Sequence, residues 1–129
     1  MKVALLQLDI AWEDVPANHA RASRLLDQAA ALGARLAILP EMFATGFSMD
    51  GRRIAQPEGG PSETFLRERA STLGLHVLAG VAEAAEPLPQ NRALLVSPDG
   101  RVKRYTKIHP FSFAGEERVM GSGDEVVTW

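Results

Sequence analysis

Arg35-Leu36-Ala37-Ile38-Leu39-Pro40-Glu41 is the stretch that decides the fold, because an apolar run of strand length ends at a proline and a carboxylate follows at once. A similar apolar run, Lys2–Leu8, lies upstream. Between the two, residues 18–32 change period, and apolar side chains recur every three or four positions, at Ala22, Leu25, Leu26, Ala29 and Leu32. That spacing is typical of an amphipathic helix. The pattern predicts strand, helix and strand, with the two strands parallel.

The rest of the chain continues this alternation of helix and strand. A second helix is predicted over Ser62–Leu73, with Ser62 as its N-cap and Gly74 as its stop. Strands are predicted over Leu75–Ala82, Arg92–Ser97 and Val102–Ile108, the last two joined by the hairpin turn Pro98-Asp99-Gly100. Long loops are expected between Glu41 and Pro61 and between Pro110 and Gly123, and such loops on α/β scaffolds often carry function.

The last five residues, Glu125–Trp129, have high β-propensity and predict a sixth strand. A core strand at a chain end is unusual, and two helices are too few to cover both faces of such a sheet. We therefore expect an α/β fold in which residues 1–129 are the N-terminal part of a single larger domain.

Composition excludes several classes of function. The chain has 129 residues, 46% of them hydrophobic, and a formal net charge of -2, so it lacks the basic excess that nucleic-acid binding needs. No apolar run approaches the roughly 20 residues of a membrane span, and no secretory signal is recognisable, so a cytoplasmic protein is expected. There is no cysteine, and the three histidines, His19, His76 and His109, lack metal-ligand spacing. We expect neither a metal nor another cofactor.

Three ionisable residues stand where strands are predicted to end. Glu41 follows the second strand, Lys107 closes the hairpin's return strand, and Glu116 lies in the loop beyond it. Strand ends form the ligand crevice of open α/β sheets, so these groups could act as base, electrostatic stabiliser and orienting group. From spacing alone, solvated charges or a structural ion pair are the commoner explanation of such residues.

Two motifs add to this interpretation. Leu39-Pro40-Glu41-Met42-Phe43-Ala44-Thr45-Gly46-Phe47 resembles the glutamate motif of the nitrilase (carbon-nitrogen hydrolase) superfamily, and Tyr105-Thr106-Lys107-Ile108-His109-Pro110-Phe111 is similar to its lysine motif. The opening strand, the end of the first helix at Leu32-Gly33-Ala34 and the hairpin 91–100 are similar too. Thr-Gly-Phe-Ser after the glutamate and the Lys-x-His-x-Phe block look most like the omega-amidase branch.

The resemblance implies an αββα-sandwich, of which this chain would be one half. It also implies that Glu41 is the general base, Lys107 the cation that stabilises a tetrahedral oxyanion, and Glu116 the second glutamate, with Glu117 as the alternative if the loop register slips by one. Apart from the resemblance, Phe43 and Phe47 are candidates to line a substrate pocket, although packing beneath the loop is the commoner role for such side chains. The expected reaction is hydrolysis of a small carboxamide to acid and ammonia through a cysteine thioester, without a cofactor, in a homo-oligomer.

One feature departs from the family, because its nucleophilic cysteine is absent from these 129 residues. Ser112 and Ser122 do not resemble nucleophiles on a sharp strand-to-helix turn, so neither is expected to replace it. The chain by itself should be inactive. The alternative is a non-catalytic pseudoenzyme or binding module, or one half of a split enzyme that docks a complementing C-terminal half through its last strand. In either case, Glu41 and Lys107 should lie within about 10 Å of each other.

Overall fold

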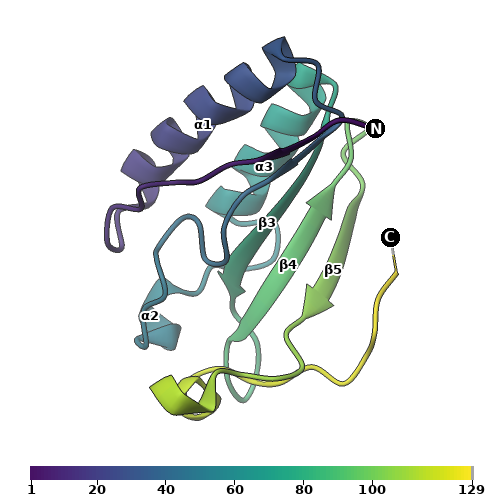
Figure 1. The fold of residues 1–129 in the computed structure, drawn as a ribbon. Coiled ribbons are helices and arrows are strands. Elements are labelled where there is room, and N and C mark those ends of the chain that lie inside the picture. Colours follow the sequence, from purple (N-terminus) through teal and green to yellow (C-terminus); the bar gives the residue numbers. More distant parts are fainter. Residues whose placement is uncertain (129) are drawn as a thin grey trace.

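Five strands form one mixed sheet, and they lie side by side in the order in which they occur along the chain. The structure, a computed structural model, describes residues 1–128. Figure 1 shows the sheet with two long helices packed on it. The elements are β1 (Val3–Leu5), α1 (Val15–Ala31), β2 (Leu36–Ile38), α2 (Gly51–Ile54), α3 (Pro61–Leu73), β3 (His76–Glu83), β4 (Gln90–Val96), β5 (Val102–Thr106) and the 3-10 helices η1 (Ser112–Ala114) and η2 (Glu116–Arg118).

The first three strands are parallel, β4 pairs antiparallel with β3, and β5 pairs antiparallel with β4. The sequence predicted the parallel pairing of the first two strands and the hairpin of the last two. Ala4 pairs with Ala37, which pairs in turn with Val77. The connections between these strands contain α1 and α3, because parallel neighbours need a long crossover. The hairpin of β4 and β5 turns at Gly100, whose φ is 81° and whose N–H donates to the Ser97 carbonyl at 2.8 Å.

The ends of the helices explain where their bounds differ from prediction. In α1, the Asp14 carboxylate accepts a hydrogen bond from the backbone N–H of Ala17 at 3.0 Å, so this helix starts three residues before the predicted Asn18. The predicted cap of α3 was wrong, because Gly60 is the N-cap and Ser62 lies inside the first turn. Ser62 is buried there, with its Oγ 3.0 Å from Nε2 of His19.

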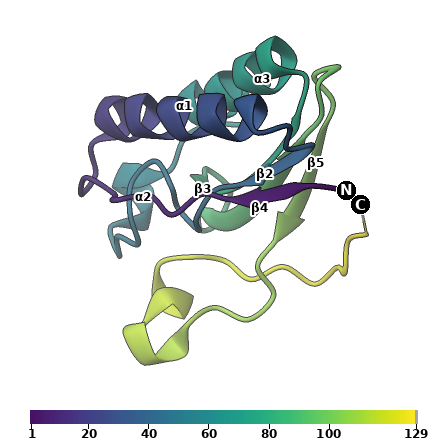
Figure 2. The ribbon, with the colours of Figure 1, turned by 45° about the horizontal axis from the view of Figure 1, so that its top comes forward.

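The hydrophobic core lies between the helices and one face of the sheet. Both α1 and α3 cover this same face, as Figure 2 shows. The core residues include Ala22, Leu26, Leu66, Ala70, Val77, Leu94 and Val96. Within residues 1–128 no second helical layer covers the opposite face, where Ile38, Leu78, Ala93 and Tyr105 help to line a shallow cavity of about 230 Å³. This one-sided architecture is that of a half domain.

The predicted sixth strand is not present in residues 125–128, and its last residue, Trp129, lies outside the described residues. β5 is an edge strand of the sheet, yet residues 125–128 do not pair with it. Here the preceding segment is held differently, because Gly121 forms an isolated bridge with Gln90 and the Gly123 N–H donates to the Lys107 carbonyl at 2.9 Å. The expected docking edge at 125–129 is therefore not formed by residues 125–128. No helix in the described chain is long and apolar enough to cross a membrane.

Candidate active site

Glu41 is held where the chain turns sharply after β2. The Pro40 carbonyl accepts a hydrogen bond from the Gly80 N–H at 3.2 Å, and the Phe43 N–H donates one to the Gly80 carbonyl at 3.1 Å. Gly80 permits this approach because a Cβ there would lie 2.7 Å from Glu41 Cα. Met42 completes the turn with a left-handed φ of 48°. The backbone of Glu41 is thus fixed directly over β3.

Lys107 comes directly after β5 and reaches both predicted carboxylates. Its Nζ lies 2.9 Å from Oε1 of Glu41 and 2.8 Å from Oε2 of Glu116. Its backbone N–H donates to Asn91 at 2.9 Å, which continues the β4–β5 ladder by one residue. The predicted convergence of these three side chains is confirmed, since the contacts are far shorter than 10 Å and come from segments 66 residues apart.

Glu116 is the first residue of η2 and is fully buried. Its Oε2 also accepts a hydrogen bond from the backbone N–H of Phe111 at 2.6 Å. Glu117 instead keeps 42% of its side chain exposed and lies 3.9 Å from Arg118. The structure therefore decides the register of this loop, and Glu116 rather than Glu117 faces Lys107.

Asn91 was not predicted to belong to the site, yet it joins the two carboxylates. It lies near the start of β4 and is only 4% exposed. Its Nδ2 donates to Oε1 of Glu41 at 2.5 Å and to Oε1 of Glu116 at 2.8 Å. The available signal was a polar residue in a strand opposite the lysine segment, but spacing does not show which face it occupies. We call Glu41, Asn91, Lys107 and Glu116 the carboxylate–lysine cluster.

The electrostatics of the cluster keep Lys107 and Glu116 charged at neutral pH. Burial alone would lower the pKa of Lys107, but the hydrogen bonds to Glu116 and Glu41 raise it above its ordinary value. Burial would likewise raise the pKa of Glu116, but hydrogen bonds from Lys107, the Phe111 backbone and Asn91 bring it below the usual range. The site therefore holds an ammonium against a buried carboxylate.

An open cleft of about 590 Å³ lies against the cluster, lined by Glu41, Phe47, Lys107, His109, Pro110, Phe111 and Ser112. The Phe47 ring centroid lies 5.2 Å from Lys107 Nζ, and Phe47 lines the cleft, while its contact with a substrate stays a prediction. Phe43 is not among the lining residues. The turn at Met42 directs it into the core, where it is fully buried and its ring centroid lies 6.1 Å from that of Phe65.

The chemistry available at the cleft follows from the free oxygen of Glu41. Within residues 1–128, no protein group hydrogen-bonds its Oε2, and the side chain keeps 49% exposure. A half-exposed carboxylate can accept a proton, and the adjacent ammonium can stabilise developing negative charge. In the described residues no group of three His, Asp or Glu side chains gathers as a metal site. Ser112 lines the cleft, whereas Ser122 lines a separate cavity beside β5.

Comparison with known proteins places this arrangement in a family. Residues 2–129 match the carbon-nitrogen hydrolase family. The chain is 36% identical over 131 residues to an omega-amidase of Yersinia enterocolitica, covering 100% of this chain and 50% of that protein. It is 37% identical over 117 residues to a nitrilase of Pyrococcus abyssi, covering 86% of this chain and 44% of that protein.

Solved structures agree with these matches. A CN-hydrolase superfamily protein of Xanthomonas campestris, with an arsenic adduct in its active site, superposes with a TM-score of 0.90 at 32% identity, covering 95% of this chain and 46% of that one. The chain spans about half the length of the curated relatives it matches. It belongs to the carbon-nitrogen hydrolase family, the nitrilase superfamily, and is similar to its omega-amidases.

Proposed function

We propose that this chain supplies the base, the cation and the orienting carboxylate of an amidase that hydrolyses a small carboxamide to a carboxylic acid and ammonia. The observation that carries the proposal is the position of Lys107 Nζ, which lies within 3 Å of an oxygen of both Glu41 and Glu116 at the edge of an open cleft. A positioned base and a fixed cation together are what acyl transfer requires.

In the proposed reaction, Glu41 takes the proton from a thiol, and the thiolate attacks the amide carbon. Lys107 stabilises the oxyanion of the tetrahedral intermediate, and Glu116 holds the ammonium in place. The intermediate expels ammonia, which takes the proton from Glu41, and a thioester remains. Water then attacks the thioester and gives a proton to Glu41, which returns it to the sulfur as the acid leaves.

The thiol has to come from sequence outside these 129 residues, since they contain no cysteine. It could lie elsewhere in the same polypeptide or in a complementing chain. An adjacent base matters to such a group, because only a few per cent of a free thiol with a pKa of about 8.5 is ionised at neutral pH.

The substrate we propose is the monoamide of a small dicarboxylic acid. Omega-amidases of Yersinia enterocolitica and Escherichia coli are 36% and 32% identical to this chain over its whole length. The cleft supports a small substrate, because Phe47 and Phe111 offer apolar surface and Lys107 and His109 offer polar groups within about 590 Å³.

The test measures ammonia release from succinic and glutaric monoamides by the complete product of the gene. Wild-type protein should release ammonia, and Glu41→Gln should lower the rate by about 10³-fold or more because the base is lost. Glu117→Gln is the matched control and should leave the rate unchanged, since Glu117 does not contact the cluster. The 129-residue chain alone should release none.

An inactive complete gene product, or a Glu41→Gln variant as fast as wild type, would overturn the proposal. Binding of the amide without turnover by that complete product would favour the non-catalytic interpretation of the chain.

A further inference from the structure

The contacts of Asn91 determine which oxygen of Glu41 is available for proton transfer. Oε1 of Glu41 accepts two hydrogen bonds, from Asn91 Nδ2 at 2.5 Å and from Lys107 Nζ at 2.9 Å. The same two donors also reach Glu116, on Oε1 and Oε2 respectively. The four side chains therefore form a closed ring of donors and acceptors.

The orientation of the Asn91 amide follows from its partners. Both are carboxylate oxygens, which accept hydrogen bonds when ionised, so the NH₂ group rather than the carbonyl must face them. An NH₂ group only donates. It can satisfy two ionised oxygens at once, and it cannot accept from a protonated carboxyl group at the same position.

A proton placed on Oε1 of Glu41 would therefore compete with two hydrogen bonds, one of them from a cation. A proton placed on Oε2 disturbs neither, because no protein group within residues 1–128 hydrogen-bonds that atom. The half-exposed Glu41 side chain also lies at the edge of the cleft.

Resting on the function proposed above, we propose that Asn91 is a positioning residue that occupies Oε1 of Glu41 and so makes Oε2 the atom that receives the nucleophile's proton. The proton moves from the nucleophile to Oε2 and later to the leaving amine, while the ring through Asn91, Lys107 and Glu116 stays intact. Asn91 also couples the base to Glu116, which is fully buried and cannot move without breaking its bond to the Phe111 backbone.

The experiment compares Asn91→Asp and Asn91→Leu with wild type in the complete gene product. Asn91→Asp keeps the shape and removes the donor, and Asn91→Leu removes polarity altogether. Each variant should lower kcat by about 100-fold, the cost of a misplaced catalytic group. The KM should change by less than about threefold, because Asn91 does not line the cleft. For Asn91→Asp, the acidic limb of kcat/KM should move to higher pH by about one unit, since a third carboxylate disfavours ionisation of the cluster.

Asn18→Asp is the matched control. Asn18 is also fully buried, but its amide nitrogen donates to backbone carbonyls, those of Ala11 at 2.7 Å and Ala44 at 2.8 Å. This variant should lower the Tm without moving the acidic limb. A merely structural role for Asn91 predicts that same result for Asn91→Asp, and that result would overturn the proposal.

A second measurement does not depend on turnover. The side-chain carboxyl carbon of Glu116 can be titrated by NMR in wild type and in Asn91→Leu, and the variant should titrate at higher pH because one donor to the ionised form is lost. An unchanged titration would overturn the proposal. If wild type has no amidase activity but the titration moves, the proposed function fails and the positioning of the carboxylates by Asn91 stands.

Discussion

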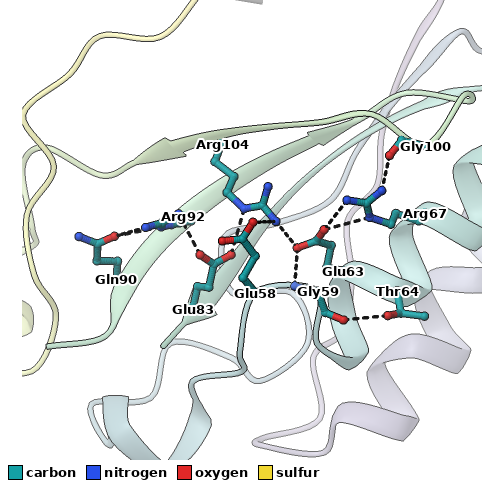
Figure 3. A network of polar contacts seen from close by, with 10 residues as sticks. All are labelled: Glu58, Gly59, Glu63, Thr64, Arg67, Glu83, Gln90, Arg92, Gly100 and Arg104. Atoms are coloured by element: carbon teal, nitrogen blue, oxygen red, sulfur yellow. Dashed lines mark hydrogen bonds and ion pairs between the residues drawn. The ribbon is translucent and has the colours of Figure 1, made fainter. Parts of the chain in front are cut away.

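Asn91 and Arg92 are neighbours in β4, and their side chains enter two different polar clusters on opposite faces of the sheet. Asn91 belongs to the carboxylate–lysine cluster, and Arg92 to a set of ion pairs beside α3, which Figure 3 shows in close-up. We call this second set the arginine network. Its charged members are Glu58, Glu63, Glu83, Arg67, Arg92 and Arg104.

Each charged member of the arginine network has an oppositely charged partner. Arg104 reaches Glu63 and, at 3.3 Å, both Glu58 and Glu83, while Arg92 lies 2.9 Å from Glu83. Three guanidinium groups face three carboxylates, so the charges balance. Burial would raise the pKa of Glu63, but hydrogen bonds from the Gly59 backbone N–H and from the guanidinium groups of Arg67 and Arg104 hold this pKa below the usual range. Such a network ties β3, β4 and β5 to α3, with Glu58, whose side chain is 70% exposed, at its outer edge.

The carboxylate–lysine cluster is built from similar groups but is left incomplete. Two carboxylates face one ammonium, one oxygen of Glu41 has no protein partner within residues 1–128, and a cleft opens beside it. Buried ion pairs add little net stability when complete, but they fix geometry. The difference teaches that a charged group with an oxygen lacking a hydrogen-bond partner at a cavity is the candidate for chemistry. A network with balanced charges instead holds the surrounding elements in place.

The largest expected effect tests the cation. Lys107→Met should lower amidase turnover by the complete gene product by about 10³-fold, because it removes the positive charge that faces the oxyanion. It also leaves Glu116 buried without a counter-ion, so the Tm should fall. Lys103→Met removes an exposed lysine from β5, the strand that Lys107 directly follows, and should leave turnover unchanged. Equal turnover in both variants would break the distinction between the two clusters.

The next effect tests how Glu41 is held. Gly80→Ala places a Cβ 2.7 Å from Glu41 Cα, so the base must shift and turnover should fall by about 100-fold. Gly121→Ala is the control, since a Cβ there meets nothing closer than 3.6 Å. Steady-state kinetics of both variants measure this effect. A Gly80→Ala enzyme with wild-type kcat would show that the close approach of Gly80 to the Glu41 backbone does not position the base.

The arginine network should respond in stability rather than in turnover. Glu63→Gln breaks charged contacts with Arg67 and Arg104, and we expect the free energy of unfolding to fall by about 2 kcal/mol. Amidase turnover below the melting range should stay within about twofold of wild type. Urea denaturation and ammonia release measured on the same preparation provide both values. A large loss of kcat without a loss of stability would make the network part of the active site.

The smallest expected effect concerns pH. The folded-state pKa values of Glu63 and Glu116 are lowered, so the stability that these groups contribute is present above their unfolded pKa of about 4.3 and is lost as pH falls through the folded values. The pKa of Lys107 is raised, so its contribution is present below about 10.4 and is lost as pH rises through the folded value.

Urea denaturation should be measured at several values between about pH 2 and pH 6, at intervals of roughly one pH unit. The urea midpoint should fall steeply with falling pH in wild type and less steeply in Glu63→Gln. Identical slopes would mean that Glu63 titrates alike in the folded and unfolded states.

The sequence by itself determined the local features of the fold and the positions of two site residues, Glu41 and Lys107. The proline after β2, the hairpin turn at Gly100 and the helical spacing of apolar residues each act within a few residues, so the order of elements and the positions of Glu41 and Lys107 could be predicted. Where a pattern depends on one chain segment and its nearest neighbours, reading it along the chain is enough.

Tertiary structure alone decided the features that depend on distant partners. Asn91 and Arg92 are adjacent and polar, so the pleat of a strand sends them to opposite faces, but only the packing of the sheet decides which of them faces Glu41 and Lys107. The choice of Glu116 over Glu117 rests on the Phe111 N–H and on Lys107, and the burial of Phe43 rests on Phe65 in α3. Residues 125–128 form no strand despite their β-propensity and the free edge of β5, because pairing also needs a matching register, and the contacts of Gly121 and Gly123 hold the preceding segment in another position.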